Sequence, residues 1–238
     1  MEKKRISVFL ARCGIASRRA CEAVVLEGRV KINGEVTKDL STLVSAADIV
    51  ELDGKPLNTP EEKISVALNK PPGYLCTARD DFKRKTVMEL LAGLSQRLYP
   101  AGRLDFNSRG LLILTNDGEL AYRITHPSFK IPKTYNVKIK GIINMKDFSV
   151  LSRGFEIEGK IFKPLELEII NKKENSPGSC IKIKIAEGRK RVIRKAFEAL
   201  GHRVTDLKRV QIGNFKLGSL KEGQYKILQA KDLRELLS

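Results

Sequence analysis

The sequence contains no tryptophan, only two histidines and no hydrophobic stretch long enough to cross a membrane. Its longest unbroken apolar runs are four residues, such as Leu111 to Leu114, whereas a membrane-spanning helix needs about 20. The four cysteines form no Cys-x-x-Cys pair, and His126 and His202 have no zinc-ligand spacing. We therefore expect free thiols, no metal site and a cytoplasmic protein without a membrane segment or signal peptide.

Motifs for nucleotide cofactors are also missing. The chain has no G-x-G-x-x-G after a predicted strand, no Walker-type glycine-rich loop and no H-E-x-x-H. It also lacks the glycine clusters that suit S-adenosylmethionine, which counts against a methyltransferase. We expect no cofactor.

The sequence is rich in positive charge. Lys and Arg total 45 and Asp and Glu total 28, which gives a formal net charge of +17 over 238 residues. A folded protein with this excess usually binds a polyanion, most often nucleic acid. The hydrophobic fraction of 42% excludes disorder as the main state. Residues 61–238 hold 35 basic and 20 acidic side chains, whereas residues 1–60 hold 10 and 8.

The first 60 residues contain the pattern of two helices followed by short hairpins. Ser17 is a good N-cap for a helix over residues 18–27, and Gly28 is placed to end that helix. Asn33-Gly34 between short apolar runs predicts a β-hairpin. The apolar face of the helix is predicted to consist of Ala20, Ala23 and Val24.

Arg18 and Arg19 stand in the first turn of this helix, where the helix dipole disfavours cations. That local cost is expected if a phosphate docks there, because backbone N–H groups and two guanidinium groups would converge on it. A solvated basic surface is the alternative. Arg12, at the end of the preceding short helix, is a further candidate contact to the polyanion.

A polar segment that contains proline, residues 57–63, separates two patterned regions, so we place the boundary between domains 1–60 and 61–238 there. Strands of alternating polarity outnumber helices in the second domain, which favours an α+β fold with a mixed, largely antiparallel sheet and flanking helices. Asn116 is the expected N-cap of one helix, and a strand is expected to close the chain. Helices are predicted over residues 86–94, 118–124, 145–152 and 190–200, and strands over 64–68, 111–115, 135–139, 165–169, 181–185, 207–212 and 225–228.

The stretch from Gly102 to Asn116 is the main candidate for chemistry. Its Asp105 lies on a loop between two strand-like segments, near Arg103 and Arg109 and among small residues. Such a loop suits close approach to a negatively charged substrate. From the residues alone, however, an aspartate of this kind is more often a turn former or an ion-pair partner.

This stretch resembles, at each position, the signature of the bacterial ribosomal pseudouridine synthases of the ribosomal small-subunit synthase type. Residues 1–60 resemble the small αL-type RNA-binding domain that a small-subunit ribosomal protein shares with tyrosyl-tRNA synthetases. The resemblance covers nearly the whole chain. Three other segments resemble further motifs of the family: Asn69-Lys70-Pro71-Pro72-Gly73-Tyr74, Pro132-Lys133-Thr134-Tyr135 and the basic run from Glu187 to Lys195.

The resemblance implies conversion of a uridine in ribosomal RNA to pseudouridine without a cofactor. The N-glycosidic bond breaks, the uracil rotates, and its C5 is joined to C1′. By motif position, Asp105 acts on the sugar, and Arg194, or Arg191 as second choice, keeps that carboxylate ionised. Tyr135 receives the flipped base. The predicted RNA contacts are Arg12, Arg18, Arg19, Lys70, Arg103, Arg189 and Arg191, with Lys70 expected to support the site rather than react.

Other interpretations remain open. From the residues alone, Tyr135 fits a core position and Arg194 a phosphate contact. A non-catalytic RNA-binding protein of ribosome assembly would share the basic surface, but it need not keep Asp105, Tyr135 and Arg194 together. The segments 99–102 and 115–123 look more like the branch that modifies large-subunit (23S) RNA than the small-subunit (16S) branch. We expect a monomer that acts on ribosomal RNA or a pre-ribosomal particle.

Overall fold

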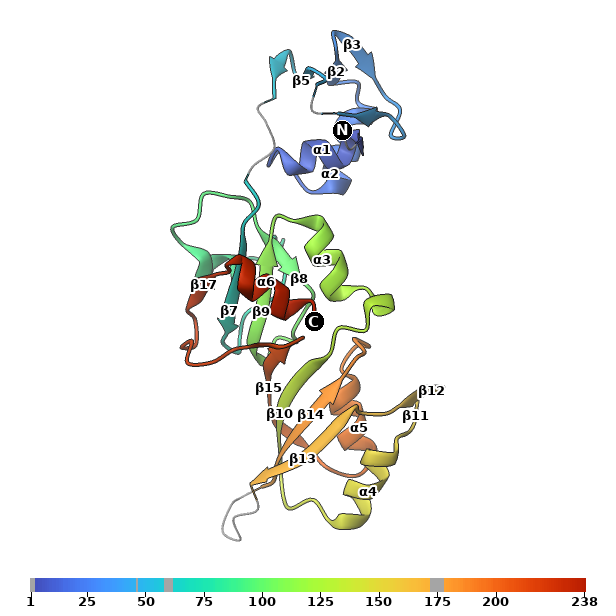
Figure 1. Ribbon diagram of the computed structural model, residues 1–238, viewed down its shortest axis with the longest axis vertical. Coiled ribbons are helices and arrows are strands. Elements are labelled where there is room, and N and C mark those ends of the chain that lie inside the picture. Colours follow the sequence, from blue (N-terminus) through green and yellow to red (C-terminus); the bar gives the residue numbers. More distant parts are fainter. Residues whose placement is uncertain (1–2, 46, 58–61, 172–177) are drawn as a thin grey trace. The chain divides into compact units, whose positions relative to one another are not determined.

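The computed structural model describes residues 3–45, 47–57, 62–171 and 178–238 (Figure 1). The chain divides into two units, residues 1–63 with the short segment 95–97, and residues 64–94 with 98–238. The predicted linker includes residues 58–61, which lie outside the described residues, so the boundary near residue 60 stays a prediction. Among the described residues, no helix is long and apolar enough to cross a membrane.

The first unit packs two helices against short strands. The helices are α1 (Ile6–Arg12) and α2 (Arg18–Leu26). Asn33 and Gly34 have φ values of +51° and +88° and form the tight turn between β2 and β3, which confirms the predicted hairpin. One sheet has the order β3 (Glu35–Thr37), β2 (Val30–Ile32), β5 (Val50–Leu52) and β6 (Lys55–Pro56), and β1 (Lys4–Arg5) pairs with β4 (Leu43–Val44).

The ends of α2 agree with the prediction, but of its predicted apolar face only Val24 packs against the core. The Ser17 hydroxyl accepts a hydrogen bond from the Ala20 N–H at 3.2 Å, and Gly28 follows the helix with φ +73°. Cys21 and Val25 are the fully buried residues of α2, whereas Ala20 is exposed. Cys21 and Val25 are four residues apart and so share one face, and this face packs into the core with residues of α1.

The second unit is built on a nine-stranded sheet. Among the described strands, every pairing is antiparallel except that of β9 with β15. The expectation of a mixed, largely antiparallel sheet is therefore confirmed. Its main path is β13 (Glu166–Asn171), β14 (Cys180–Ile185), β10 (Lys133–Ile139), β15 (Val204–Ile212), β9 (Arg109–Thr115), β7 (Ser65–Lys70) and β17 (Tyr225–Ile227), with β16 (Phe215–Lys216) beside β15 and β8 (Tyr99–Ala101) beside β9.

Both faces of β9 are buried. Leu112 and Leu114 belong to one core cluster and Leu111 and Ile113 to another, since neighbouring residues of a strand point to opposite faces. The strand therefore lies in the middle of the unit, and the Asp105 loop leads directly into it. On one face of the sheet, the first cluster includes residues of η1 (Val87–Leu91), α4 (Met145–Arg153), α5 (Val192–Ala199) and the hairpin of β11 (Phe155–Ile157) and β12 (Lys160–Phe162). On the other face, the second cluster includes residues of α3 (Gly118–Thr125) and α6 (Ala230–Leu236) (Figure 1).

The parallel pairing of β9 with β15 depends on a glycine. Gly110 stands opposite Arg209 with φ +101°, and a Cβ at this position would lie 2.2 Å from the Arg209 carbonyl oxygen. Only glycine allows this approach. Arg109 then donates Nε and Nη2 to the Asp206 carboxylate at 2.8 and 2.7 Å and also pairs with Glu222. These hydrogen bonds from Arg109 lower the pKa of Asp206.

The N-cap of α3 differs from the prediction. Asp117 rather than Asn116 caps the helix, and its carboxylate accepts from the Glu119 N–H at 3.0 Å. The Asn116 side chain instead accepts from the Ile64 N–H at 2.8 Å, just before β7. Adjacent Asn and Asp residues both suit an N-cap, and the tertiary contact decides between them.

Three other predicted boundaries also change. The capping box at Thr86 is present, but only the short 3₁₀ helix η1 follows it, because the chain leaves helical geometry at Ala92. α5 begins at Val192, since Arg191 before it is in the left-handed region with φ +56°. The chain closes with α6 rather than with a strand, and the Gln229 side chain and Asp232 form its capping box.

Gly110→Ala is expected to lower the free energy of unfolding by about 2–4 kcal/mol, because it adds backbone strain to a clash with the Arg209 carbonyl. Gly159→Ala is the matched control: its φ is +74°, but the added Cβ meets no atom within 4 Å. That control should cost only about 1–2 kcal/mol. Urea denaturation measures both, and equal losses would show that the close approach at Gly110 is unimportant.

Candidate active site

A buried lysine holds the Asp105 loop in place. Lys70, the last residue of β7, is fully buried, and its ammonium donates to the carbonyls of Pro71, Asp105, Phe106 and Ser108 at 2.8–3.3 Å. Burial lowers the pKa of this ammonium. The Lys70 side chain is therefore occupied beneath the loop, and the RNA contact predicted for it stays a prediction that this position does not support. Its position agrees with the supporting role expected from the first motif.

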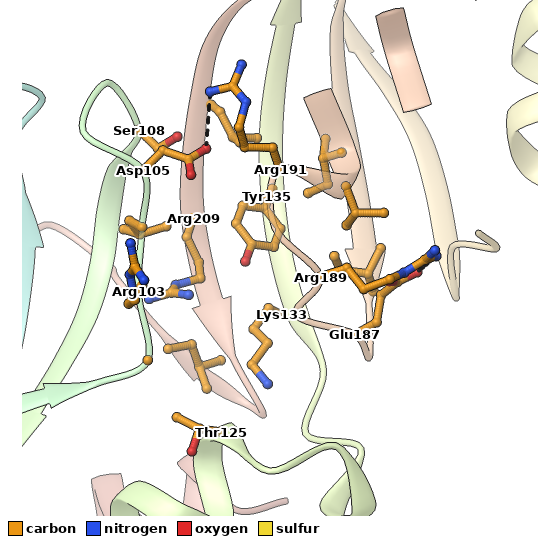
Figure 2. Close-up of a pocket in the computed structure, with 18 of the residues that line it drawn as sticks. Arg103, Asp105, Ser108, Thr125, Lys133, Tyr135, Glu187, Arg189, Arg191 and Arg209 are labelled. Carbon is orange, nitrogen blue, oxygen red and sulfur yellow. Dashed lines mark hydrogen bonds and ion pairs between the residues drawn. The ribbon is translucent and has the colours of Figure 1, made fainter. Parts of the chain in front are cut away.

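The Asp105 carboxylate lies at a cavity of about 320 Å³ (Figure 2). Its Oδ2 atom is 3.7 Å from Nε of Arg194 and 3.9 Å from Nη1 of Arg191. The Asp105 side chain is 32% exposed, so it is open to the cavity yet close to both cations. The two arginines come from the start and the first turn of α5, whereas the aspartate comes from the loop before β9.

Arg194 is the more firmly held of the two arginines. Its Nη1 donates to the Val204 carbonyl at 3.2 Å and its Nη2 to the Ser108 hydroxyl at 3.3 Å. Its Nε is buried and has no hydrogen-bond partner among the described atoms, although Asp105 lies within ion-pair distance. Burial and the neighbouring Arg191 lower the pKa of Arg194, but a guanidinium remains charged at neutral pH.

Tyr135 on β10 lines the same cavity and is 9% exposed. In Figure 2 its ring lies between Asp105 and Lys133, with the hydroxyl toward the Lys133 end. The interpretation of Tyr135 as a core residue therefore holds, but it describes only one of the two roles of this side chain. The ring packs in the first core cluster, and the residue also forms part of the cavity wall.

Two cations of the cavity received no role in the sequence analysis. Lys133 donates to the carbonyls of Ile124 and Ile131 at 3.0 and 2.8 Å, and burial, with the nearby Arg209, lowers the pKa of Lys133 to about 8. Arg209 is 3% exposed and donates Nε to the Leu111 carbonyl at 2.6 Å. Lys133 lies in the motif that contains Tyr135, so its position carried a signal. Arg209 lies in a strand with other polar residues, such as Lys208 and Gln211, so no signal in the sequence distinguished it.

The cavity contains no set of side chains suited to a metal ion. Within the described part of the chain, no group of three or more His, Cys, Asp and Glu side chains is placed to coordinate one.

Comparison with known proteins identifies the family. A model of the RNA pseudouridylate synthases matches residues 64–199, which is more than half of the chain. The chain belongs to this family. A second model, for the S4 domain, matches residues 4–50. The protein is therefore an RNA pseudouridine synthase with an N-terminal S4 domain, as the resemblance implied, and it isomerises uridine to pseudouridine in RNA.

The synthase resembles its relatives over nearly its full length. It is 43% identical over 238 residues to an RNA pseudouridine synthase of Aquifex aeolicus (strain VF5), with 99% of this chain and 94% of that protein covered. It is 37% identical over 233 residues to ribosomal large subunit pseudouridine synthase B of Bacillus subtilis (strain 168), with 98% and 95% covered. A crystal structure of a pseudouridylate synthase matches with a TM-score of 0.68 at 32% identity and covers 98% of this chain and 99% of that one.

Two further arginines of the synthase domain have different surroundings. Arg103 is exposed at the cavity, which agrees with its predicted availability to RNA. Arg189 instead forms an ion pair with Glu187 and donates to the carbonyls of Ile157 and Ile161, both at 3.2 Å. The RNA contact predicted for Arg189 stays a prediction, and in this structure its guanidinium ties the β11–β12 hairpin to the cavity wall.

The remaining predicted RNA contacts lie in the S4 unit of the synthase. Arg12 ends α1, and Arg18 and Arg19 are exposed in the first turn of α2. Arg18 forms an ion pair with Glu22 at 3.2 Å, one turn further along the helix. These positions leave RNA contact by the three arginines as a prediction.

Lys133 is expected to make the stability of the synthase depend on pH. Its folded pKa of about 8 is below the ordinary 10.5, so between these values the unfolded chain binds more protons. The free energy of unfolding should therefore rise through this window, by up to about 3 kcal/mol relative to Lys133→Met. Urea denaturation at several pH values measures the difference. Lys138→Met, at an exposed position of β10, should keep the wild-type slope, and equal slopes for Lys133→Met would contradict the prediction.

Proposed function

We propose that the enzyme isomerises a specific uridine of large-subunit ribosomal RNA, with the Asp105 carboxylate as its reacting group. The observation that carries the proposal is the position of Asp105 at a cavity, within 4 Å of the two guanidinium groups of Arg191 and Arg194. The choice of the large subunit is supported by the name of the Bacillus subtilis relative. The strong positive charge of the chain supports an RNA substrate in general.

The chemistry requires an ionised carboxylate. Asp105 either attacks C1′ of the ribose or removes its 2′ proton to form a glycal, and in both routes the uracil leaves as an anion. Once RNA covers the cavity, the loss of water favours a protonated carboxyl group, which does neither. A nearby cation opposes that shift, because charges interact more strongly away from water.

Arg194 suits this electrostatic role better than Arg191. Its side chain is 13% exposed, against 48% for Arg191, and two hydrogen bonds fix it. A buried N–H without a partner is unfavourable, so Nε of Arg194 is available to donate to Asp105 when the site closes on RNA. The phosphate contact considered for Arg194 is less suitable for a side chain this deep, whereas Arg191 is open to the solvent.

Tyr135 is placed to receive the target base. A side chain that lines a cavity cannot reach a uracil inside a base stack, so the nucleotide must flip out of it. The Tyr135 ring then offers a stacking surface, and its hydroxyl is the nearby group for removing the C5 proton. Arg103, exposed at the cavity, fills the gap left by the flipped base or binds an adjacent phosphate.

In this proposal the two domains have different functions. Residues 1–60, with Arg12, Arg18 and Arg19, select the RNA, and residues 61–238 modify it as part of a monomer. The preferred partner is free ribosomal RNA or a pre-ribosomal particle.

Asp105→Asn is expected to abolish catalysis but to retain RNA binding. The amide keeps the shape of the side chain and removes its basicity, so release of tritium from C5-labelled uridine in ribosomal RNA should fall at least about 100-fold. Filter retention of the same RNA should stay near the wild-type value. Glu168→Gln, which removes an exposed carboxylate on β13, should leave both measurements unchanged. Normal tritium release by Asp105→Asn would contradict the assignment of Asp105 as the reacting group.

The proposed subunit is tested by mapping the product. Unmodified transcripts of both ribosomal RNAs are incubated with the enzyme, treated with carbodiimide and read by primer extension. A single new stop is expected, in the large-subunit transcript, because the cavity takes one flipped base from a selected RNA. A stop in the small-subunit transcript alone would overturn the choice of subunit and leave the isomerase activity standing.

A further inference from the structure

The end of α3 and the turn after it carry three exposed rings, those of Tyr122, His126 and Phe129. Tyr122 is 51% exposed and Phe129 is 41% exposed, although aromatic side chains usually bury much of their area. Leu120 and Ile124 anchor α3 in the second core cluster. The three rings, called the aromatic platform below, are therefore not the residues that attach this helix to the sheet.

The rings of the platform are ordered against one another. The centroids of Tyr122 and His126 are 4.7 Å apart, and those of Tyr122 and Phe129 are 5.5 Å apart in an edge-on arrangement. Nδ1 of His126 lies 2.7 Å from the Ser128 hydroxyl and accepts from the Ser128 N–H at 3.3 Å, at the start of η2 (Pro127–Phe129). A surface that is already ordered loses less conformational entropy when a partner binds.

The platform borders the active-site cavity. Thr125, between Tyr122 and His126 in the sequence, lines that cavity and is labelled in Figure 2. His126 and Lys130 line a second hollow of about 450 Å³, which shares Thr125 and Lys133 with the first. The two hollows are therefore neighbours, and the second reaches the His126 edge of the platform.

Cations lie on this part of the surface. Arg123 and Lys130 are exposed and stand next to Tyr122 and Phe129 in the sequence. Aromatic rings beside cations suit single-stranded RNA, because bases stack on the rings while phosphates pair with the charges. An apolar surface of a protein would leave these two cations without counterions.

We propose that the aromatic platform stacks an unpaired base of the substrate RNA close to the target uridine, while Arg123 and Lys130 bind its phosphates. The choice of substrate RNA as the partner of the platform rests on the proposed function, since the RNA whose uridine enters the cavity must continue across the adjoining surface. The platform holds this flanking segment while the target nucleotide is flipped. Stacking accepts any base, so the platform increases affinity without selecting sequence.

The first test is kinetic and uses the full chain. In Tyr122→Ala/Phe129→Ala, KM for tritium release from ribosomal RNA should rise roughly tenfold, the effect of losing a stacked base, with kcat unchanged. Tyr122→Phe/Phe129→Tyr keeps both rings and should keep the wild-type KM. Ile170→Ala, which shortens a 47% exposed side chain on β13, is the control for loss of exposed apolar surface. Thermal denaturation checks that each variant is folded, and an unchanged KM in the folded alanine variant would overturn the proposal.

The second test does not depend on catalysis and uses the absence of tryptophan from the chain. Phe129→Trp places the one indole of the protein on the platform, and Ile170→Trp places it on β13 as the control. Binding of a large-subunit ribosomal RNA transcript should quench the fluorescence of the first variant and leave that of the second unchanged. A fully paired RNA duplex should quench neither, because its bases are already stacked.

The two tests separate the platform from the proposed function. If the wild-type enzyme released no tritium from ribosomal RNA, the proposed function would fail, and the fluorescence titration would still decide whether the platform stacks bases. If filter retention shows bound transcript without quenching, or if the duplex quenches equally, the stacking proposal is wrong. Quenching of Phe129→Trp by the transcript alone supports it.

Discussion

The ammonium of Lys70 is the contact on which the position of the Asp105 loop depends. It lies out of reach of water and donates to four backbone carbonyls, three of which belong to the loop of Asp105, Phe106 and Ser108. Hydrogen bonds from a charged donor contribute about 1.5–3 kcal/mol each, and a buried carbonyl without a donor is unfavourable. The loop therefore has one favourable path over Lys70, and this path sets where the Asp105 carboxylate stands before RNA binds.

Most of the charged side chains that line the cavity around that carboxylate are positive. Arg191 and Arg194 approach Asp105, while Lys133 and Arg209 line the cavity with their donors partly used by backbone carbonyls. Burial is the main cause of the lowered pKa of Lys133, and repulsion from the nearby Arg209 adds to it. An RNA phosphate or the carbonyl groups of a base would relieve that repulsion, so the free enzyme is prepared for a polyanionic substrate.

Local patterns in the sequence predicted much of the fold and part of the site. The Ser17 cap, the Asn33-Gly34 turn and the alternation in Tyr135 to Ile139 depend on neighbouring residues, and the structure has each of them. The motif resemblance also singled out Asp105 and Arg194, which lie 3.7 Å apart. These features were accessible because each is contained in a short segment or in a recognisable motif.

Other features depend on partners far along the chain, and composition does not reveal them. Lys70 and Arg189 look like surface cations in the sequence. Lys70 is nevertheless buried under a loop, and Arg189 donates to the carbonyls of Ile157 and Ile161, which lie 32 and 28 positions before it. The buried face of α2 was misplaced for the same reason, since either side of that helix is apolar enough to pack. Which side is buried is decided by the location of α1.

The parallel pairing of β9 and β15 also affects the order in which parts of the enzyme fold during synthesis. Arg109 and Asp206, which tie the two strands, are 97 positions apart in the chain. Closing so long a loop costs entropy before any contact compensates for it, so contacts of this kind usually form late in folding. The N-terminal part of a nascent chain emerges from the ribosome first, so Asp105 leaves the ribosome before Arg194 and β15 are synthesised. A nascent chain can therefore fold its S4 domain well before it has an active site.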